Sequence, residues 1–136
     1  MSKIRNERLE KEVKKVQKKP HAKGCRYMTA RGELVRSRSE RKIANELFAK
    51  GIEYVYEKKL IIKNKCFIPD FTLRIGDKTV YLEHLGLLNM EEYAKKWKRK
   101  KEIYEKEGII EGVNLIITKE EDLNALQIEK ELKAYY

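Results

Sequence analysis

Apolar residues recur along the chain with two periods, and the changes of period mark the expected elements. Residues 3–18 place Leu9, Val13 and Val16 at helical spacing among lysines, which predicts a thin amphipathic helix that ends before a proline. The segment 20–36 contains one proline and two glycines and is typical of a loop or irregular linker. The first third of the chain thus predicts one short helix and a connection.

A second helix is expected where four apolar residues form one stripe. Ser37 or Ser39 can cap its start, and Gly51 stands where a helix commonly ends. The stripe consists of Ile43, Ala44, Leu47 and Phe48.

The remaining chain alternates between strand and helix patterns. Strands are expected over 53–62, 66–75, 78–85 and 113–118, and helices over 90–107 and 120–134. From residue 34 onward the order is one helix, three strands of antiparallel type, a helix, a strand and a helix. This order predicts an α/β fold.

Charge divides the chain of 136 residues into two parts. Residues 1–42 hold 15 Lys and Arg against 5 Asp and Glu, which accounts for the whole net charge of +10. A basic arm of this kind most often contacts a polyanion, although a solubilising tail has the same composition. We therefore expect an arm and linker over 1–33 and a folded domain over 34–136.

Composition also excludes several classes of protein. The chain has no apolar run near the ~20 residues that a bilayer span requires, and its start lacks a signal-peptide core. Two distant cysteines, Cys25 and Cys66, make neither a disulfide framework nor a four-ligand zinc site. We expect a cytoplasmic protein without a membrane partner, associated with the nucleoid if the polyanion that it contacts is DNA.

Three carboxylates and one lysine break the local pattern of the elements in which they stand. Glu40 lies one turn before the apolar stripe of its helix. Within 66–75, Phe67, Phe71, Leu73 and Ile75 share one side and Asp70 falls on the other. Glu83 likewise shares a side with Tyr81, opposite Val80 and Leu82. Lys100 lies on a helical stripe with Tyr93, Trp97 and Tyr104.

Acids in such positions need a positive partner, because a buried carboxylate is costly unless it is paired, hydrogen-bonded or bound to a cation. Each acid taken singly is more often structural. Together, Glu40, Asp70 and Glu83 favour a hard divalent cation, Mg²⁺ or Mn²⁺ in its place, since oxygen ligands suit these ions and no Cys/His cluster indicates zinc.

These residues carry a resemblance to a known superfamily of nucleases. The segments "SRSERKIANELFAKG", "FIPDFTL" and "VYLEHLG" resemble, in order, the helix Glu, the "PD" strand and the "E-x-K" strand of the PD-(D/E)xK superfamily. The resemblance covers about residues 34–118 and is greatest to a small nuclease module that occurs free-standing or attached to superfamily-1 helicases. It implies a restriction-endonuclease-like αβββαβ core with a mixed central sheet flanked by helices.

The resemblance also implies a site and a chemistry. Asp70 and Glu83 would hold Mg²⁺ together with the backbone carbonyl of His84, and Glu40 would complete the shell directly, through water or by holding a second ion. The cation would activate a water and stabilise the charge that develops on the phosphate. The His84 ring should point away from this face and pack or form hydrogen bonds.

One departure concerns the lysine of the E-x-K motif, because that position holds Leu85. Some members of the superfamily supply this lysine from the next helix. Lys100 fits that substitution and Lys96 is the second candidate. In the alternative interpretation, the Lys100 stem covers the aromatic residues and its ammonium lies in solvent.

Several basic residues are candidates for nucleic-acid binding. No recognition helix or zinc finger is present in the sequence pattern, so structure-selective or weakly sequence-selective contact is expected. The candidates are Lys11, Lys14, Lys15, Lys18, Lys19, Arg36, Arg38 and Lys96.

The leading functional prediction is a Mg²⁺-dependent DNA endonuclease that leaves 5′-phosphate products. The missing E-x-K lysine motivates an alternative, a catalytically inactive nuclease fold that binds DNA or recruits a partner. A third interpretation is a basic RNA-binding protein with structural carboxylates. Cutting both strands usually takes two sites, which is compatible with a homodimer, and the subfamily resemblance is compatible with a helicase-like partner.

Overall fold

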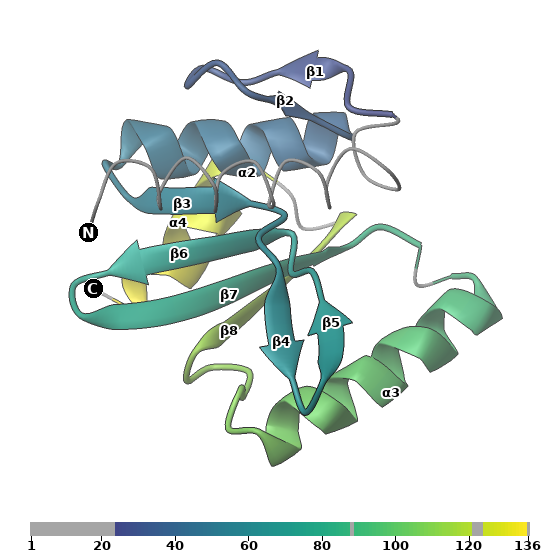
Figure 1. The fold of residues 1–136 in the computed structure, drawn as a ribbon. Coiled ribbons are helices and arrows are strands. Elements are labelled where there is room, and N and C mark those ends of the chain that lie inside the picture. The colour runs from purple at the N-terminus through teal and green to yellow at the C-terminus, as the bar shows by residue number, and fades with distance from the viewer. Residues whose placement is uncertain (1–23, 88, 121–123, 136) are drawn as a thin grey trace, which may run out of the picture.

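The computed structural model describes residues 24–87, 89–120 and 124–135 (Figure 1). The helix expected over 3–18 and the arm lysines Lys11, Lys14, Lys15, Lys18 and Lys19 lie outside the described residues. Among the helices that are described, none is long and apolar enough to span a membrane. In chain order the elements are β1 (Tyr27–Met28), β2 (Leu34–Val35), α2 (Arg38–Ala49), β3 (Glu53–Tyr56), β4 (Leu60–Ile62), β5 (Lys65–Phe67), β6 (Phe71–Ile75), β7 (Lys78–Leu85), α3 (Glu91–Lys106), β8 (Leu115–Lys119) and α4 (Ala125–Lys133).

Helix α2 forms where the sequence predicts it, because both of its ends carry capping residues. The Ser37 hydroxyl accepts a hydrogen bond from the backbone N–H of Glu40 at 3.1 Å, which makes Ser37 the N-cap. Gly51 follows the helix with a φ of +70°, a conformation that glycine adopts without a side-chain clash. Between these ends, Ile43 and Leu47 are fully buried.

The central sheet has the strand order β3-β6-β7-β8 and is mixed. β3, β6 and β7 pair antiparallel, whereas β8 pairs parallel with β7 after the chain has passed through α3. A parallel pair needs such a crossover, since a tight turn can join only antiparallel neighbours. The predicted α/β class with a mixed central sheet is confirmed.

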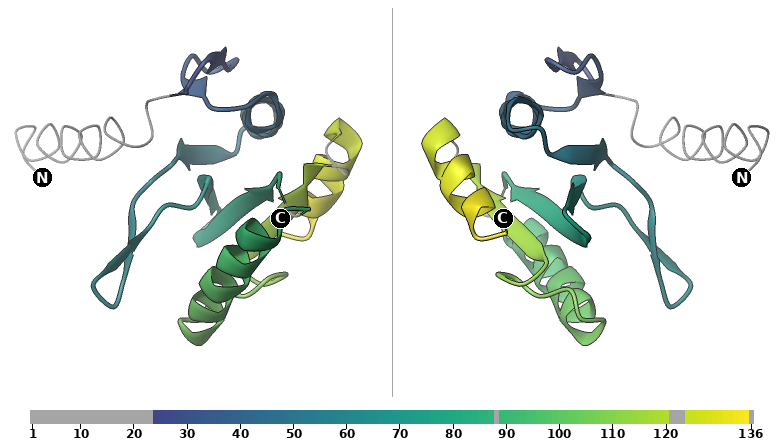
Figure 2. Two further views of the ribbon diagram at one scale, coloured as in Figure 1. Left: turned by 90° about the vertical axis from the view of Figure 1, so that its right-hand side faces the viewer. Right: turned by 90° about the vertical axis from the view of Figure 1, so that its left-hand side faces the viewer.

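Helices cover both faces of this sheet (Figures 1 and 2). One core lies between the sheet and helices α2 and α4, and it contains Phe71, Leu73, Val80 and Leu82. A second core lies on the face covered by α3 and centres on the fully buried Tyr104. The two strands β6 and β7 therefore send alternate residues into different surroundings.

The strands expected over 53–62 and 66–75 are not continuous, and that prediction is wrong. The chain leaves the sheet after β3 and returns at β6, and the intervening β4 and β5 form a separate hairpin. Glu57 takes a φ of +52° at the first break, and Pro69, which has no N–H to donate, stands at the second. Because of this bend, Phe67 packs in the α3 core rather than beside Phe71 and Leu73.

A short hairpin replaces the irregular segment expected over 20–36. Tyr27 pairs with Val35 and Met28 with Leu34. Val35 is fully buried. The described residues before position 34 thus pair with the strand that leads into the predicted domain.

Candidate active site

Asp70 and Glu83 come together because they stand opposite each other on neighbouring strands. Asp70 directly precedes β6, and the register that pairs Phe71 with Leu82 continues to bring Asp70 against Glu83. The backbone N–H of Asp70 donates to Glu83 Oε1 at 2.9 Å. The backbone N–H of His84 donates to Asp70 Oδ2 at 2.7 Å. Each carboxylate is therefore held by the main chain of the other strand.

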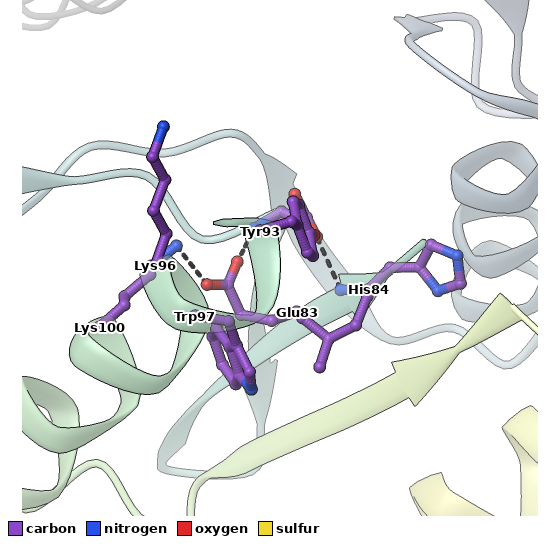
Figure 3. A pocket seen from close by; sticks show the side chains of 8 residues that line it. Glu83, His84, Tyr93, Lys96, Trp97 and Lys100 are labelled. Carbon is purple, nitrogen blue, oxygen red and sulfur yellow. Dashed lines mark hydrogen bonds and ion pairs between the residues drawn. The ribbon is translucent and has the colours of Figure 1, made fainter. Parts of the chain in front are cut away.

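The two carboxylates open into a cavity of about 190 Å³ (Figure 3). Helix α3 closes its other side with an aromatic and basic wall. The lining residues are Asp70, Glu83, His84, Leu85, Tyr93, Lys96, Trp97 and Lys100.

Lys100 reaches the acidic pair, whereas Lys96 does not. The Lys100 ammonium forms an ion pair with Glu83 Oε2, and the Lys96 side chain extends away from Glu83 (Figure 3). The Lys100 ammonium also lies 5.5 Å from the centre of the Tyr104 ring. The inward stripe on this helix is thus confirmed, and of the two candidate lysines Lys100 is the one that contacts an acid.

Charge repulsion is concentrated on Asp70. Burial, followed by the charges of Glu83 and Glu40, raises the pKa of Asp70 well above its ordinary value. The His84 N–H and the Lys100 ammonium act in the opposite direction. Among the described residues no donor reaches the second oxygen of Asp70, Oδ1, so a cation near this oxygen would relieve the repulsion.

Glu40 faces the same region from helix α2 but is held by different partners. It is 7% exposed, and its Oε1 accepts hydrogen bonds from the Tyr56 hydroxyl at 2.9 Å and from Ser37 at 3.3 Å. Burial raises the pKa of Glu40. Within the described part of the chain, no three acidic, His or Cys side chains are close enough to hold one metal ion together. The structure therefore brings Asp70 and Glu83 together and leaves Glu40 as a neighbour.

The His84 ring points away from the acidic pair, as strand alternation predicts (Figure 3). Its Nδ1 lies 2.9 Å from Thr118 Oγ1, and its Nε2 lies 2.6 Å from Glu120 Oε2. Glu120 also accepts the Ser39 hydroxyl, at 2.6 and 2.8 Å. These hydrogen bonds, with that of Ser39 first, lower the pKa of Glu120.

This network joins three elements behind the site, and sequence reasoning missed it. Ser39 directly precedes Glu40 on α2, and His84 directly follows Glu83 on β7, while Glu120 follows β8. Glu120 thereby links the helix that carries one acid to the strand that carries another. In the sequence, Glu120 resembles an acidic residue at the start of a helix, so no local pattern predicts its hydrogen bonds to Ser39 and His84.

The pair fits an oxygen-preferring divalent cation, and the main chain offers a third oxygen. In an extended strand the N–H and C=O of one residue point to the same side. Since the His84 N–H points to Asp70, its carbonyl faces that side also. Two carboxylates and a carbonyl are the oxygen donors that Mg²⁺ or Mn²⁺ accepts, with water completing the shell.

The residues predicted to bind nucleic acid differ in their exposure and in whether an acid pairs with them. Lys96 is exposed at the cavity and Arg38 is exposed at the start of α2. Arg36 is half-buried and pairs with Glu57 at 2.6 Å, which gives it a structural partner.

Comparison with known proteins yields one informative similarity and no family. No protein-family model matches the chain. The chain is similar to "Uncharacterized protein MJ1519" of Methanocaldococcus jannaschii, with 36% identity over 129 residues. The match covers 84% of this chain and 11% of that protein. The chain thus spans about a tenth of the length of this relative.

Proposed function

We propose that this chain is a divalent-metal-dependent DNA endonuclease of the PD-(D/E)xK superfamily with a restriction-endonuclease-like fold. The observation that carries the proposal is the Asp70–Glu83 pair with Lys100 in one cavity. The mixed sheet, with Asp70 directly before β6 and Glu83 on the antiparallel β7, supports the same assignment. Cleavage would leave a 5′-phosphate and a 3′-hydroxyl, as the family resemblance implies.

Asp70 and Glu83 would bind the cation, with the His84 carbonyl as a further ligand and Glu40 acting through water. A bound Mg²⁺ supplies positive charge that makes water acidic enough to attack phosphorus at neutral pH. The buried position of Glu83 keeps its carboxylate in a fixed place, since it is 4% exposed and held by the Asp70 N–H.

Lys100 would supply electrostatic stabilisation. Its ammonium lies at the edge of the cavity beside Glu83, where negative charge on a scissile phosphate would develop. The position that the E-x-K motif reserves for lysine holds Leu85, a buried apolar residue that lines the cavity without a charge. Lys100 therefore takes the role from the neighbouring helix.

The second candidate function is DNA binding without cleavage. The Lys100–Glu83 ion pair favours it, because a lysine that neutralises the acid makes the site stable without a cation. The two candidates differ in one measurable property, which is metal-dependent strand scission.

The experiment incubates the purified chain with supercoiled, branched and single-stranded DNA in Mg²⁺, Mn²⁺ or EDTA. We expect cleavage that requires the metal and is abolished in Asp70→Asn. The matched control is Asp77→Asn, in an exposed turn at the other end of β6 and β7, which should cleave like wild type. If wild type and Asp70→Asn leave all substrates equally intact, the enzyme assignment fails.

A further inference from the structure

The β4–β5 hairpin projects from the sheet beside the candidate site (Figure 2). The hairpin lies between the two chain breaks at Glu57 and Pro69. At its base, the backbone N–H of Glu57 donates a hydrogen bond to the carbonyl of Asp70 at 3.0 Å. The backbone of Asp70 is therefore hydrogen-bonded directly to the base of the hairpin. A ligand held on the hairpin would be close to the cavity.

The hairpin has one face packed against α3, and within the described ranges no element covers its outer face. Its turn, Lys63–Asn64, has φ values of +47° and +67°, which are typical of the tight turn that suits two twisted strands. On the inner face, Ile62 is 7% exposed and Phe67 packs against Tyr104 with ring centres 5.7 Å apart. Packing on α3 thus fixes the orientation of the opposite face.

That opposite face carries a small apolar patch, and the hairpin as a whole is basic, with Lys65 paired to Ile62 on the other face but exposed. Ile61 and Cys66 form a cross-strand pair there, and Ile61 is 56% exposed. From 58 to 67 the chain carries four lysines and no acidic residue. Among the described residues, only Lys63 of the four has a carboxylate partner, Glu107 at 3.0 Å.

We propose that the β4–β5 hairpin is a docking surface for double-stranded nucleic acid, with its exposed lysines contacting phosphates on either side of the ribbon and Ile61, on the outer face, lying at the groove. A two-stranded ribbon fits the width of the major groove of DNA. Single-strand binders stack bases on aromatic side chains, and the one aromatic residue of this hairpin, Phe67, faces inward. The inference rests on the proposed function for the choice of DNA.

The two cysteines of the chain allow binding at this surface to be measured, because one lies on the hairpin and the other outside it. Cys66 is exposed on the outer face, whereas Cys25 is half-buried and lies outside the hairpin. Burial raises the pKa of the Cys25 thiol. Alkylation by iodoacetamide should therefore be faster at Cys66 and can be followed separately at each residue by mass spectrometry.

The experiment measures alkylation of Asp70→Asn in EDTA with a DNA duplex or one of its single strands. We expect duplex bound at saturation to slow the modification of Cys66 and to leave Cys25 unchanged. Unchanged alkylation of Cys66 on saturated protein would overturn the proposal. Stronger protection by the single strand than by the duplex would also overturn it.

Charge reversal provides a second measurement. Lys59→Glu with Lys65→Glu should weaken duplex binding and make the negative slope of log K against log salt shallower by about 1.8, since each of the two lost phosphate contacts removes ~0.9. The matched control reverses Lys78, at the start of β7, and Lys130, on α4, which are exposed and lie outside the hairpin, and it should keep the wild-type slope. Equal slopes for the two double variants would contradict the proposal.

The two proposals can fail separately. Protection of Cys66 without any cleavage by wild type would remove the endonuclease and keep the docking surface. Metal-dependent cleavage without protection would keep the enzyme and remove the surface.

Discussion

Replacing Asp70 by Asn should stabilise the protein while it abolishes the proposed cleavage. The raised pKa of Asp70 means that the folded protein holds a proton on this group more readily than the unfolded chain does. As pH rises from the unfolded pKa through the folded one, the folded state must give up that proton, so its stability falls. At neutral pH the ionisable Asp70 therefore makes the fold less stable than it is at acidic pH.

The size of the effect follows from the local contacts. Asn keeps an oxygen that can accept the His84 N–H, so the substitution removes charge and preserves shape. One pKa unit corresponds to about 1.4 kcal/mol, so we expect a gain of about 1 kcal/mol or more at neutral pH. For a chain of this length, 1 kcal/mol raises the Tm by about 3–5 °C.

Thermal unfolding in EDTA across the acidic to neutral range is the assay. The variant should exceed wild type at pH 7, and the difference should shrink as the pH is lowered and Asp70 of wild type becomes protonated. Mn²⁺ should then reverse the order, because ligand at 100 times Kd stabilises the binding-competent wild type by about 2.7 kcal/mol. A variant that is less stable than wild type at pH 7 in EDTA would refute the reasoning.

Three further predictions test the lysine, the network and the core. Lys100→Met should lower kcat about 10²–10³-fold in single-turnover cleavage, with the affinity for duplex unchanged, and a wild-type rate would exclude the proposed role. The same variant should lower the free energy of unfolding in urea by about 1.5–3 kcal/mol, because Glu83 loses a charged partner. Glu120→Ala should raise the Mn²⁺ concentration for half-maximal cleavage about 10–100-fold, whereas Glu120→Gln, which keeps a hydrogen-bond acceptor, should stay close to the wild-type concentration. Equal Mn²⁺ dependence of the two variants would argue against a positioning role for Glu120. Ile43→Ala should cost about 2–5 kcal/mol in urea unfolding, since Ile43 is fully buried, and a loss below 1 kcal/mol would show that the core adjusts.

Local patterns predict much of this fold and part of the site. The Ser37 cap and Gly51 mark the ends of α2, and alternation along β7 separates Leu82 from Glu83 as expected. These features depend on a few neighbouring residues, so the sequence contains them. Helical spacing alone also predicts the place of Lys100 on the inward stripe of α3, whereas its place beside the acids is an expectation from the family resemblance.

Other features depend on distant contacts that no local pattern contains. The breaks at Glu57 and Pro69 interrupt what reads as two long strands, because the hairpin between them gains packing against Tyr104 on α3. The Glu120 link to Ser39 spans 81 residues of sequence, and its existence follows only from the place of β8 in the sheet. The position of Glu40 beside, but outside, the acidic pair likewise depends on how Tyr56 holds it.

The β6–β7 connection has a consequence for the order in which the site assembles during folding. Gly76 and Asp77 join the two strands in a two-residue turn, so the acids meet through one of the shortest chain closures in the domain. Lys100 arrives only when α3 docks, and β8 adds its parallel strand after that helix in the chain. Contacts of greater sequence separation form more slowly. We therefore expect the like charges to become neighbours before their counterion is present, and the docking of α3 to be the step that balances them.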